Sequence, residues 1–169
     1  TPNTVRVFYY DRSGNLVRTV PSVPADSSQL VFPATDHSLP PGFEGSAVLQ
    51  SDTPLIAVAT EQRGDAPPSY FQGLTPGNPD IVLPLVLQEG TQHQSFFHIQ
   101  NPETIPVDVT VRYYGTDMFQ DEVLHTESFS LPAQGSSETT PDILINLFPN
   151  GFQGGVQIES SGSSCAVTA

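Results

Sequence analysis

Lysine is missing from this chain of 169 residues, and basic side chains of any kind are scarce. Five arginines stand against 18 acidic residues, which gives a formal net charge of −13. Nucleic-acid binding needs a cluster of basic side chains that neutralises phosphates, so we expect no nucleic-acid partner. The absence of lysine also excludes a Schiff-base enzyme and a phosphate-binding loop of the Walker type.

Cysteine and long apolar runs are equally scarce. The single cysteine, Cys165, excludes a disulfide within the chain. No apolar run approaches the roughly 20 residues that span a bilayer, so we expect no membrane insertion. The sequence contains neither an HExxH zinc motif nor a GxSxG nucleophile turn. These absences predict a protein that is not an enzyme and needs no cofactor, with calcium as the one ion left to consider.

Proline and glycine are abundant, at 17 and 13 residues, while charged residues make up only 14% of the chain. Together with apolar residues in alternation, this composition predicts an all-β protein of short strands and tight turns. In the first half we expect strands at about 4–10, 15–20, 28–33, 46–51 and 55–61. In the second half we expect them at about 81–88, 94–100, 107–114, 122–131, 155–160 and 164–169. The best helix candidate is the short segment Pro141–Phe148, which has proline at its first turn.

Two passages occur twice in the chain. GFEGSAVLQSDTPLIAVAT, from Gly42 to Thr60, matches GFQGGVQIESSGSSCAVTA, from Gly151 to Ala169, without a gap at an offset of 109. VRVFYY at 5–10 matches VTVRYY at 109–114, at an offset of 104. A period of about 105 residues is typical of tandem sandwich domains of the immunoglobulin (Ig) type. We therefore predict two tandem Ig-like antiparallel β-sandwich repeats, at residues 1–80 and 81–169.

Each predicted repeat is incomplete at a chain end. The second repeat has two strands ahead of VTVRYY, at 81–88 and 94–100, whereas the first begins directly at VRVFYY. The first repeat continues after Thr60, whereas the second ends at Ala169. A sandwich that lacks strands exposes apolar surface and an open sheet edge, which favours strand addition from a partner. We expect either a piece of a longer tandem array or a chain that assembles with other copies through strand pairing.

The order of these motifs resembles a known group of proteins. The series NP-x-x-x-P-V-x-V-x-V-x-Y-Y, L-P-A, G-F-x-G and I-A-V-A is similar to the tandem Ig-like β-sandwich repeats of large secreted or cell-surface bacterial proteins. The resemblance implies an extracellular or cell-surface module without catalytic activity, such as a filament unit, a stalk or an adhesin. It carries over no binding residue, because such repeats share scaffold positions rather than a site.

The candidate assembly residues lie in the terminal strands. In the first strand, arginine recurs only on one face, so the opposite face is predicted to be buried. In the last strand, the cysteine aligns with Ile56 of the first repeat, so we expect an inert, buried thiol. Backbone pairing and burial of these strands would join copies into a homo-oligomer or a filament. The residues with this predicted role are Val5, Val7, Tyr9, Cys165 and Val167.

Two acidic loops carry oxygen side chains at spacings that a calcium site uses. Asp11 and Asn15 lie in the turn DRSGN, and Asp117 and Asp121 lie in the longer loop GTDMFQDE. A solvated turn is the simpler interpretation of each loop, because glycine or extra length suits a hairpin connection. Calcium binding is the alternative at both places.

The sequence supports one leading function and two alternatives. The leading expectation is a non-catalytic extracellular structural module, a subunit of a self-assembling filament or surface layer built by head-to-tail β-strand complementation. One alternative is a carbohydrate-binding or adhesive module whose glycan ligand contacts exposed tyrosine and phenylalanine rings. The other is an accessory domain of a secreted hydrolase, whose catalytic region would lie outside these residues.

Overall fold

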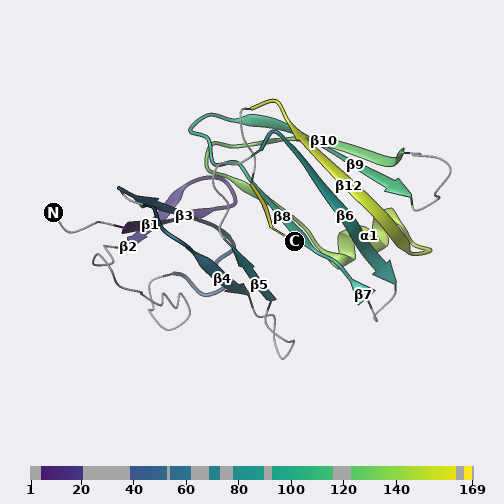
Figure 1. Cartoon of the computed structure of the whole chain (residues 1–169), viewed down its shortest axis with the longest axis horizontal. Coiled ribbons are helices and arrows are strands. Elements are labelled where there is room, and N and C mark those ends of the chain that lie inside the picture. The colour runs from purple at the N-terminus through teal and green to yellow at the C-terminus, as the bar shows by residue number, and fades with distance from the viewer. Residues whose placement is uncertain are drawn as a thin grey trace. The chain divides into compact units, whose positions relative to one another are not determined.

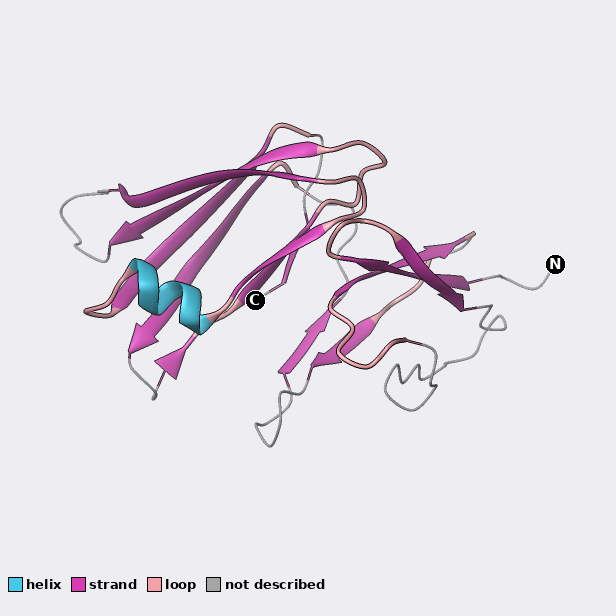
Figure 2. Cartoon of the chain, turned by 180° about the vertical axis from the view of Figure 1, so that it is seen from behind, coloured by secondary structure: helices cyan, strands magenta, loops and turns pink. Residues whose placement is uncertain are grey.

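The computed structural model of the chain describes residues 5–20, 39–52, 54–61, 69–72, 78–89, 93–115, 123–162 and 166–168. The chain divides into two compact units, Thr1–Gly73 and Leu74–Ala169, whereas the repeats in the sequence predict a boundary between residues 80 and 81. The described residues form antiparallel sheets and, within this part of the chain, a single short helix (Figure 1, Figure 2). The prediction of an all-β fold is therefore confirmed.

The first unit contains two small antiparallel sheets. β1 (Val5–Asp11) is the central strand of one sheet, with β2 (Leu16–Val20) on one side and β3 (Gly45–Ser51) on the other. β4 (Val58–Glu61) and β5 (Ser69–Gln72) form the other sheet. Gly14 takes a positive φ of 81° in the turn between β1 and β2, as the tight hairpin requires.

The second unit consists of two further antiparallel sheets and the helix. Its larger sheet has the strand order β10-β9-β12-β6-β7, and its smaller sheet has the order β11-β8-β13. The strands of the larger sheet are β6 (Asp80–Glu89), β7 (His93–Gln94), β9 (Val107–Gly115), β10 (Val123–Leu131) and β12 (Phe152–Ser160). The strands of the smaller sheet are β8 (Phe97–Gln100), β11 (Ser136–Thr139) and β13 (Ala166–Thr168).

The core of the second unit lies between these two sheets. Val111 and Tyr113 of β9 are fully buried in the larger sheet. Phe97 and Ile99 of β8 join the same cluster from the smaller sheet, and Leu144 joins it from the helix. Figure 1 shows the long strands side by side in one layer, with β8 and the helix in the other. Two sheets that share one apolar core form a two-layered β structure.

Two residues at the start of the helix α1 (Pro141–Leu147) explain why the helix begins there. The Thr140 hydroxyl accepts a hydrogen bond of 3.4 Å from the backbone N–H of Ile143 and so caps the first turn. Pro141 stands in that turn, where its missing N–H costs no helical hydrogen bond. The helix candidate from the sequence is confirmed.

A buried asparagine ties the loop after β8 to the loop after β10. The Asn101 side chain has no exposed surface, and its Nδ2 donates to the carbonyl oxygens of Ile105 and Pro132, both at 2.8 Å. Its Oδ1 accepts from the backbone N–H of Glu103 at 2.9 Å. Both the nitrogen and the oxygen of the Asn101 amide are hydrogen-bonded. These bonds offset the free-energy cost of removing the amide from water.

Three strands of the first unit pair in the same way as three strands of the second. In the first unit Tyr9 lies opposite Ala47, and in the second Tyr113 lies opposite Val156. These pairs differ by the offsets of 104 and 109 that the two repeated passages show. The ladder of β1 with β2 shifts register between Tyr9 and Tyr10, and the ladder of β9 with β10 shifts at the equivalent place. The order β2-β1-β3 therefore corresponds to β10-β9-β12.

The second glycine of the GF-x-G passage lies against the backbone of a neighbouring strand. A Cβ at Gly154 would overlap the carbonyl oxygen of Tyr114. The ring of Phe152 packs edge-on against Tyr113, with the ring centroids 5.9 Å apart. The first unit repeats this arrangement with a ring separation of 6.2 Å between Tyr9 and Phe43, and with Gly45 against Tyr10.

We predict that Gly154→Ala lowers the free energy of unfolding of the second unit by about 2 kcal/mol or more, because the new methyl group collides with backbone. Gly155→Ala is the matched control, since a Cβ there meets its nearest atom at 3.6 Å, an ordinary contact. The control should change stability by no more than about 0.5 kcal/mol. Chemical denaturation of the full chain measures both, and equal effects of the two substitutions would contradict the close approach.

Candidate functional site

The predicted assembly residues of the first strand lie in the middle of a sheet. Val7 and Tyr9 are each only 7% exposed, which confirms that their face is buried. β1 carries β2 on one side and β3 on the other, so both of its edges are already paired. An added strand therefore has to pair elsewhere, and the edge strands of the described sheet are β2 and β3.

Of the two predicted assembly residues of the last strand, the structure describes only Val167. Val167 lies in β13 and pairs with Ile99 of β8 within the same unit. Cys165 falls outside the described residues. Ile56, with which Cys165 aligns in the repeat, is 85% exposed in the first unit. The alignment with Ile56 therefore gives no support to a buried thiol.

Asp11 and Asn15 bind each other across the β1–β2 turn. Asp11 Oδ1 accepts from the backbone N–H of Asn15 at 2.9 Å, and Oδ2 accepts from its Nδ2 at 3.0 Å. These bonds, the side-chain bond first, hold the pKa of the exposed Asp11 carboxyl below its usual value. Both carboxylate oxygens thus serve the hairpin, and calcium binding at this turn stays a prediction.

The remaining predicted calcium ligands, Asp117 and Asp121, lie outside the described residues. Within the ranges that the structure describes, no three Asp, Glu, His or Cys side chains gather closely enough to hold a metal ion. One titratable group of the second unit, the phenol of Tyr113, lies in its core. Tyr113 donates a hydrogen bond of 2.8 Å to Glu127, and burial raises the pKa of its phenol far above the usual value.

The outer edge of β3 is the first of two candidate binding sites. In the second unit, Val156 and Ile158 of β12 are 0% and 1% exposed, and β6 pairs with the far side of that strand. At the equivalent positions of β3, Ala47 is exposed and Leu49 is 40% exposed. Among the described strands of its sheet, β3 pairs with β1 alone. The edge thus combines backbone hydrogen-bonding groups with apolar side chains that water reaches.

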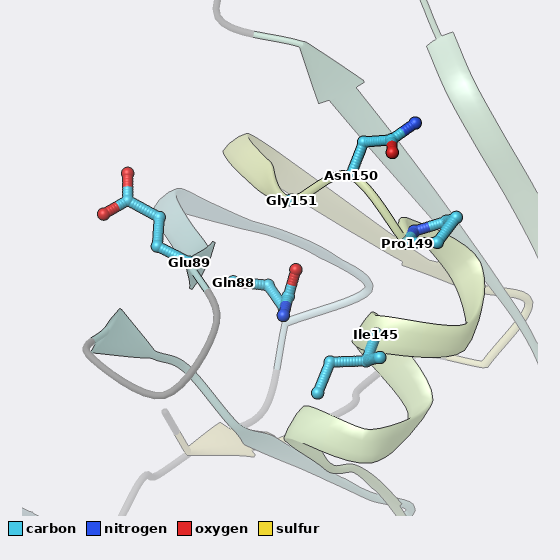
Figure 3. Close-up of a pocket in the computed structure, with 6 residues that line it drawn as sticks. All are labelled: Gln88, Glu89, Ile145, Pro149, Asn150 and Gly151. Atoms are coloured by element: carbon cyan, nitrogen blue, oxygen red, sulfur yellow. The ribbon is translucent and has the colours of Figure 1, made fainter.

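The second feature is a hollow of about 510 Å³ at one end of the second unit. Figure 3 shows its lining, with the Gln88 side chain near the centre of the group. Gln88 is only 4% exposed, and its buried Oε1 has no hydrogen-bond partner among the residues that the structure describes. An unpaired buried acceptor is costly, so it favours a donor supplied by a ligand. The lining residues are Gln88, Glu89, Ile145, Pro149, Asn150 and Gly151.

The sequence predicts an assembly role for the first strand, and the structure places that strand, β1, in the middle of its sheet. The alignment makes Ala47 and Leu49 equivalent to Val156 and Ile158 of β12, the strand that β6 covers. Strand order within the sheet is needed to see which strands lie at its edges. Gln88 carries a weaker signal, since it is the one polar residue that ends the apolar run IVLPLVLQ. Neither feature corresponds to a recognisable motif.

Comparison with known proteins adds no further guide to function. No family model, no curated protein and no solved structure matches the chain. Among the described residues, no helix is both long and apolar enough to cross a bilayer.

We predict that Asn15→Ala raises the pKa of the Asp11 carboxyl toward its ordinary value. The substitution removes the side-chain donor Nδ2, and without it the backbone N–H of residue 15 is no longer held in place against Asp11. A folded-state pKa that is lowered stabilises the hairpin above the unfolded pKa, and this contribution is lost as the pH falls through the folded value. Ser13→Ala is the control, since it leaves the Asn15 donors in place. An NMR titration of the carboxyl carbon measures the pKa, and identical values in wild type and Asn15→Ala would refute the assignment.

Proposed function

We propose that this chain is a non-catalytic structural module of the cell exterior, built from two tandem Ig-like β-sandwich repeats, each incomplete at a chain end. In this proposal it joins other subunits of a filament or surface layer through head-to-tail β-strand complementation. The single observation that carries the proposal is the outer edge of β3, which lies beside β1 alone among the described strands of its sheet. Its location outside the cell rests on the resemblance of the sequence motifs.

The shared strand pairing of the two units supports the proposal of tandem repeats. β2-β1-β3 and β10-β9-β12 have the same order and register, including the shift in one ladder and the glycine against the tyrosine carbonyl. The second unit adds a second sheet over an apolar core, as in a sandwich. A unit built on the same plan, with fewer strands among its described residues, is suited to complementation.

Strand addition at β3 would satisfy two physical needs at once. An edge strand presents N–H and C=O groups that pair readily with another extended chain. The side chain of Leu49, now 40% exposed, would gain an apolar neighbour across the new pair. Contacts of this type are not self-complementary, so they extend from copy to copy instead of closing.

We predict that wild-type chain forms oligomers that grow with concentration and that Leu49→Lys reduces them to monomer, because a lysine on an edge strand blocks pairing. Leu16→Lys is the matched control: Leu16 is 54% exposed on β2, whose counterpart β10 is also an edge strand. This control should assemble like wild type. Val5 and Val7 are poor targets, because Val7 is buried and its replacement by Asp would unfold the unit.

Size-exclusion chromatography with light scattering measures the molar mass of each variant, and electron microscopy shows any filaments. A wild-type chain that stays monomeric at every concentration would contradict assembly. Equal loss of assembly in Leu16→Lys and Leu49→Lys would show that the β3 edge has no special role.

A second candidate function is carbohydrate binding or adhesion, and the hollow around Gln88 favours it. Sugar hydroxyls are donors that could reach the unpaired Oε1, while Ile145 and Pro149 supply apolar surface beside it. The hollow lies at the surface end of β6, α1 and the turn into β12, so a glycan could approach from outside (Figure 3).

If this second function holds, Gln88→Met should weaken glycan binding about fivefold, since one hydrogen bond contributes roughly 1 kcal/mol. Folding should be preserved, because methionine keeps the length of the side chain and removes an unpaired buried acceptor. Gln153→Met, exposed on β12 and absent from the lining, is the control. A glycan array identifies the ligand and titration measures its affinity; an array without any hit would remove this candidate.

A further inference from the structure

The hollow at one end of the second unit surrounds a side chain whose backbone is fixed on both sides. Gln88 of β6 pairs with Phe152 of β12 on one side and with Gln94 of β7 on the other. Its side chain is 4% exposed, and its Oε1 has no hydrogen-bond partner within the described part of the chain. Figure 3 shows this amide in the middle of the lining residues, between the end of β6 and α1. A buried acceptor held in this way favours a ligand that brings a hydrogen-bond donor.

The last turn of α1 forms one wall of the hollow and carries partial negative charge. Ile145 lies in that turn, and the helical donor for its carbonyl would be the backbone nitrogen of Pro149, which bears no hydrogen. The last helical bond runs from the N–H of Phe148 to the carbonyl of Leu144 at 2.8 Å. The last turn of α1, which the structure describes in full, contains no basic side chain. The carbonyl end of a helix favours a cation, so this wall favours a positively charged ligand.

The charge around the hollow has the same sign. Among the described lining residues, Glu89 alone is charged. Glu89 is exposed, and Figure 3 shows its carboxylate on the outer side of the group, away from the Gln88 amide. The whole chain carries a formal net charge of −13. This field attracts cations toward the hollow, and the attraction weakens as salt is added.

Apolar side chains and a glycine complete the lining. Ile145 and Pro149 are both exposed and supply apolar surface beside the amide. Gly151 has a positive φ of 97°, and a Cβ there would lie 3.2 Å from the carbonyl oxygen of Gln88. The turn into β12 therefore adds no side chain at this position. Apolar surface next to a buried acceptor suits a ligand with a methylene stem and a head that carries N–H groups.

We propose that the hollow around Gln88 binds a basic side chain, the guanidinium or ammonium group of an arginine or lysine on a partner polypeptide. The head donates an N–H to Gln88 Oε1 beside the carbonyl end of α1. The methylene stem lies along Ile145 and Pro149, and the exposed carboxylate of Glu89 adds a long-range attraction.

A cationic head matches this lining better than a neutral sugar does. A sugar hydroxyl satisfies Gln88 Oε1, but it gains little from the helix end or from Glu89, because it carries no charge. A hydrogen bond from a charged donor is also stronger than one from a neutral donor. The ligand class therefore differs from the neutral glycan of the second candidate function, and it does not depend on strand addition at β3.

The test adds n-butylguanidinium, n-butylurea or glucosamine to the full chain. The first two compounds share shape and N–H donors and differ in charge, while glucosamine carries its ammonium group on a sugar ring. NMR titration at the methyl groups of Ile145 and the side-chain amide of Gln88 measures each dissociation constant. n-Butylguanidinium should bind about tenfold more tightly than n-butylurea, because a hydrogen bond to a charged group contributes roughly 1.4 kcal/mol more than a neutral one.

Three variants locate the binding. Gln88→Met should weaken binding of n-butylguanidinium about tenfold, because it removes the acceptor and keeps the length of the side chain. Glu89→Gln should weaken it about twofold at low salt and leave it unchanged at high salt, because an exposed charge is screened. Asp108→Asn is the matched control. It removes the same charge from an exposed residue at the opposite end of the sheet, where Val109 pairs with Ser160, and it should bind like wild type.

The outcomes separate this inference from the proposed function. Tighter binding of n-butylguanidinium than of n-butylurea, lost in Gln88→Met, supports a basic side chain. Equal binding of the two compounds overturns it, and so does equal weakening by Glu89→Gln and Asp108→Asn. Glucosamine that binds more tightly than n-butylguanidinium overturns a polypeptide source in favour of an amino sugar. A neutral glycan that binds at Gln88, with no binding of n-butylguanidinium, sustains the second candidate function and overturns the inference. None of these results bears on assembly through β3, which Leu49→Lys tests.

Discussion

The close approach of strand β12 to strand β9 at Gly154 is the contact on which the second unit depends. Only a residue without a side chain lets the backbone lie against the Tyr114 carbonyl, and this approach brings Phe152 edge-on to the Tyr113 ring. Tyr113 is the largest fully buried side chain of the chain's described core. The same contact in the first unit, between Gly45 and Tyr10, explains why the GF-x-G and YY passages recur together in the sequence.

The same local contact leads to different degrees of burial in the two units. In the second unit, β6 and the smaller sheet surround β12, and Ile158 is 1% exposed. In the first unit, the described strands leave Leu49 partly open to water, although its backbone pairing with β1 is intact. Local sequence thus determines the pairing of three strands, while complete burial requires neighbours that come from elsewhere in the chain or beyond it.

Much of this structure could be predicted from alternation and repetition. The strands expected at 81–88, 107–114 and 122–131 correspond closely to β6, β9 and β10, because period-two patterns are long and regular there. The expected strand at 28–33 falls outside the described residues. Strand order could not be predicted, because a sequence pattern identifies a face of a strand and leaves its neighbours undetermined. For this reason the sequence predicts an assembly role for the first strand, which the structure places between β2 and β3. The hollow at Gln88 was missed because its lining comes from three separate segments.

Strand addition at β3 has a free-energy balance that favours a tethered partner. β12 and β6 form seven residue pairs, and each cross-strand pair contributes roughly 0.2–1 kcal/mol. Association of two free molecules costs at least about 4 kcal/mol in lost translational and rotational freedom. The pairing alone therefore roughly offsets the cost of bringing a free strand to the edge. A strand carried on the same or an already bound polypeptide avoids most of that cost, because its effective concentration is high. In the second unit β6 is such a strand, since the chain itself carries it to β12. A repeat array or a filament, in which every neighbour is held in place, would supply the same advantage at β3.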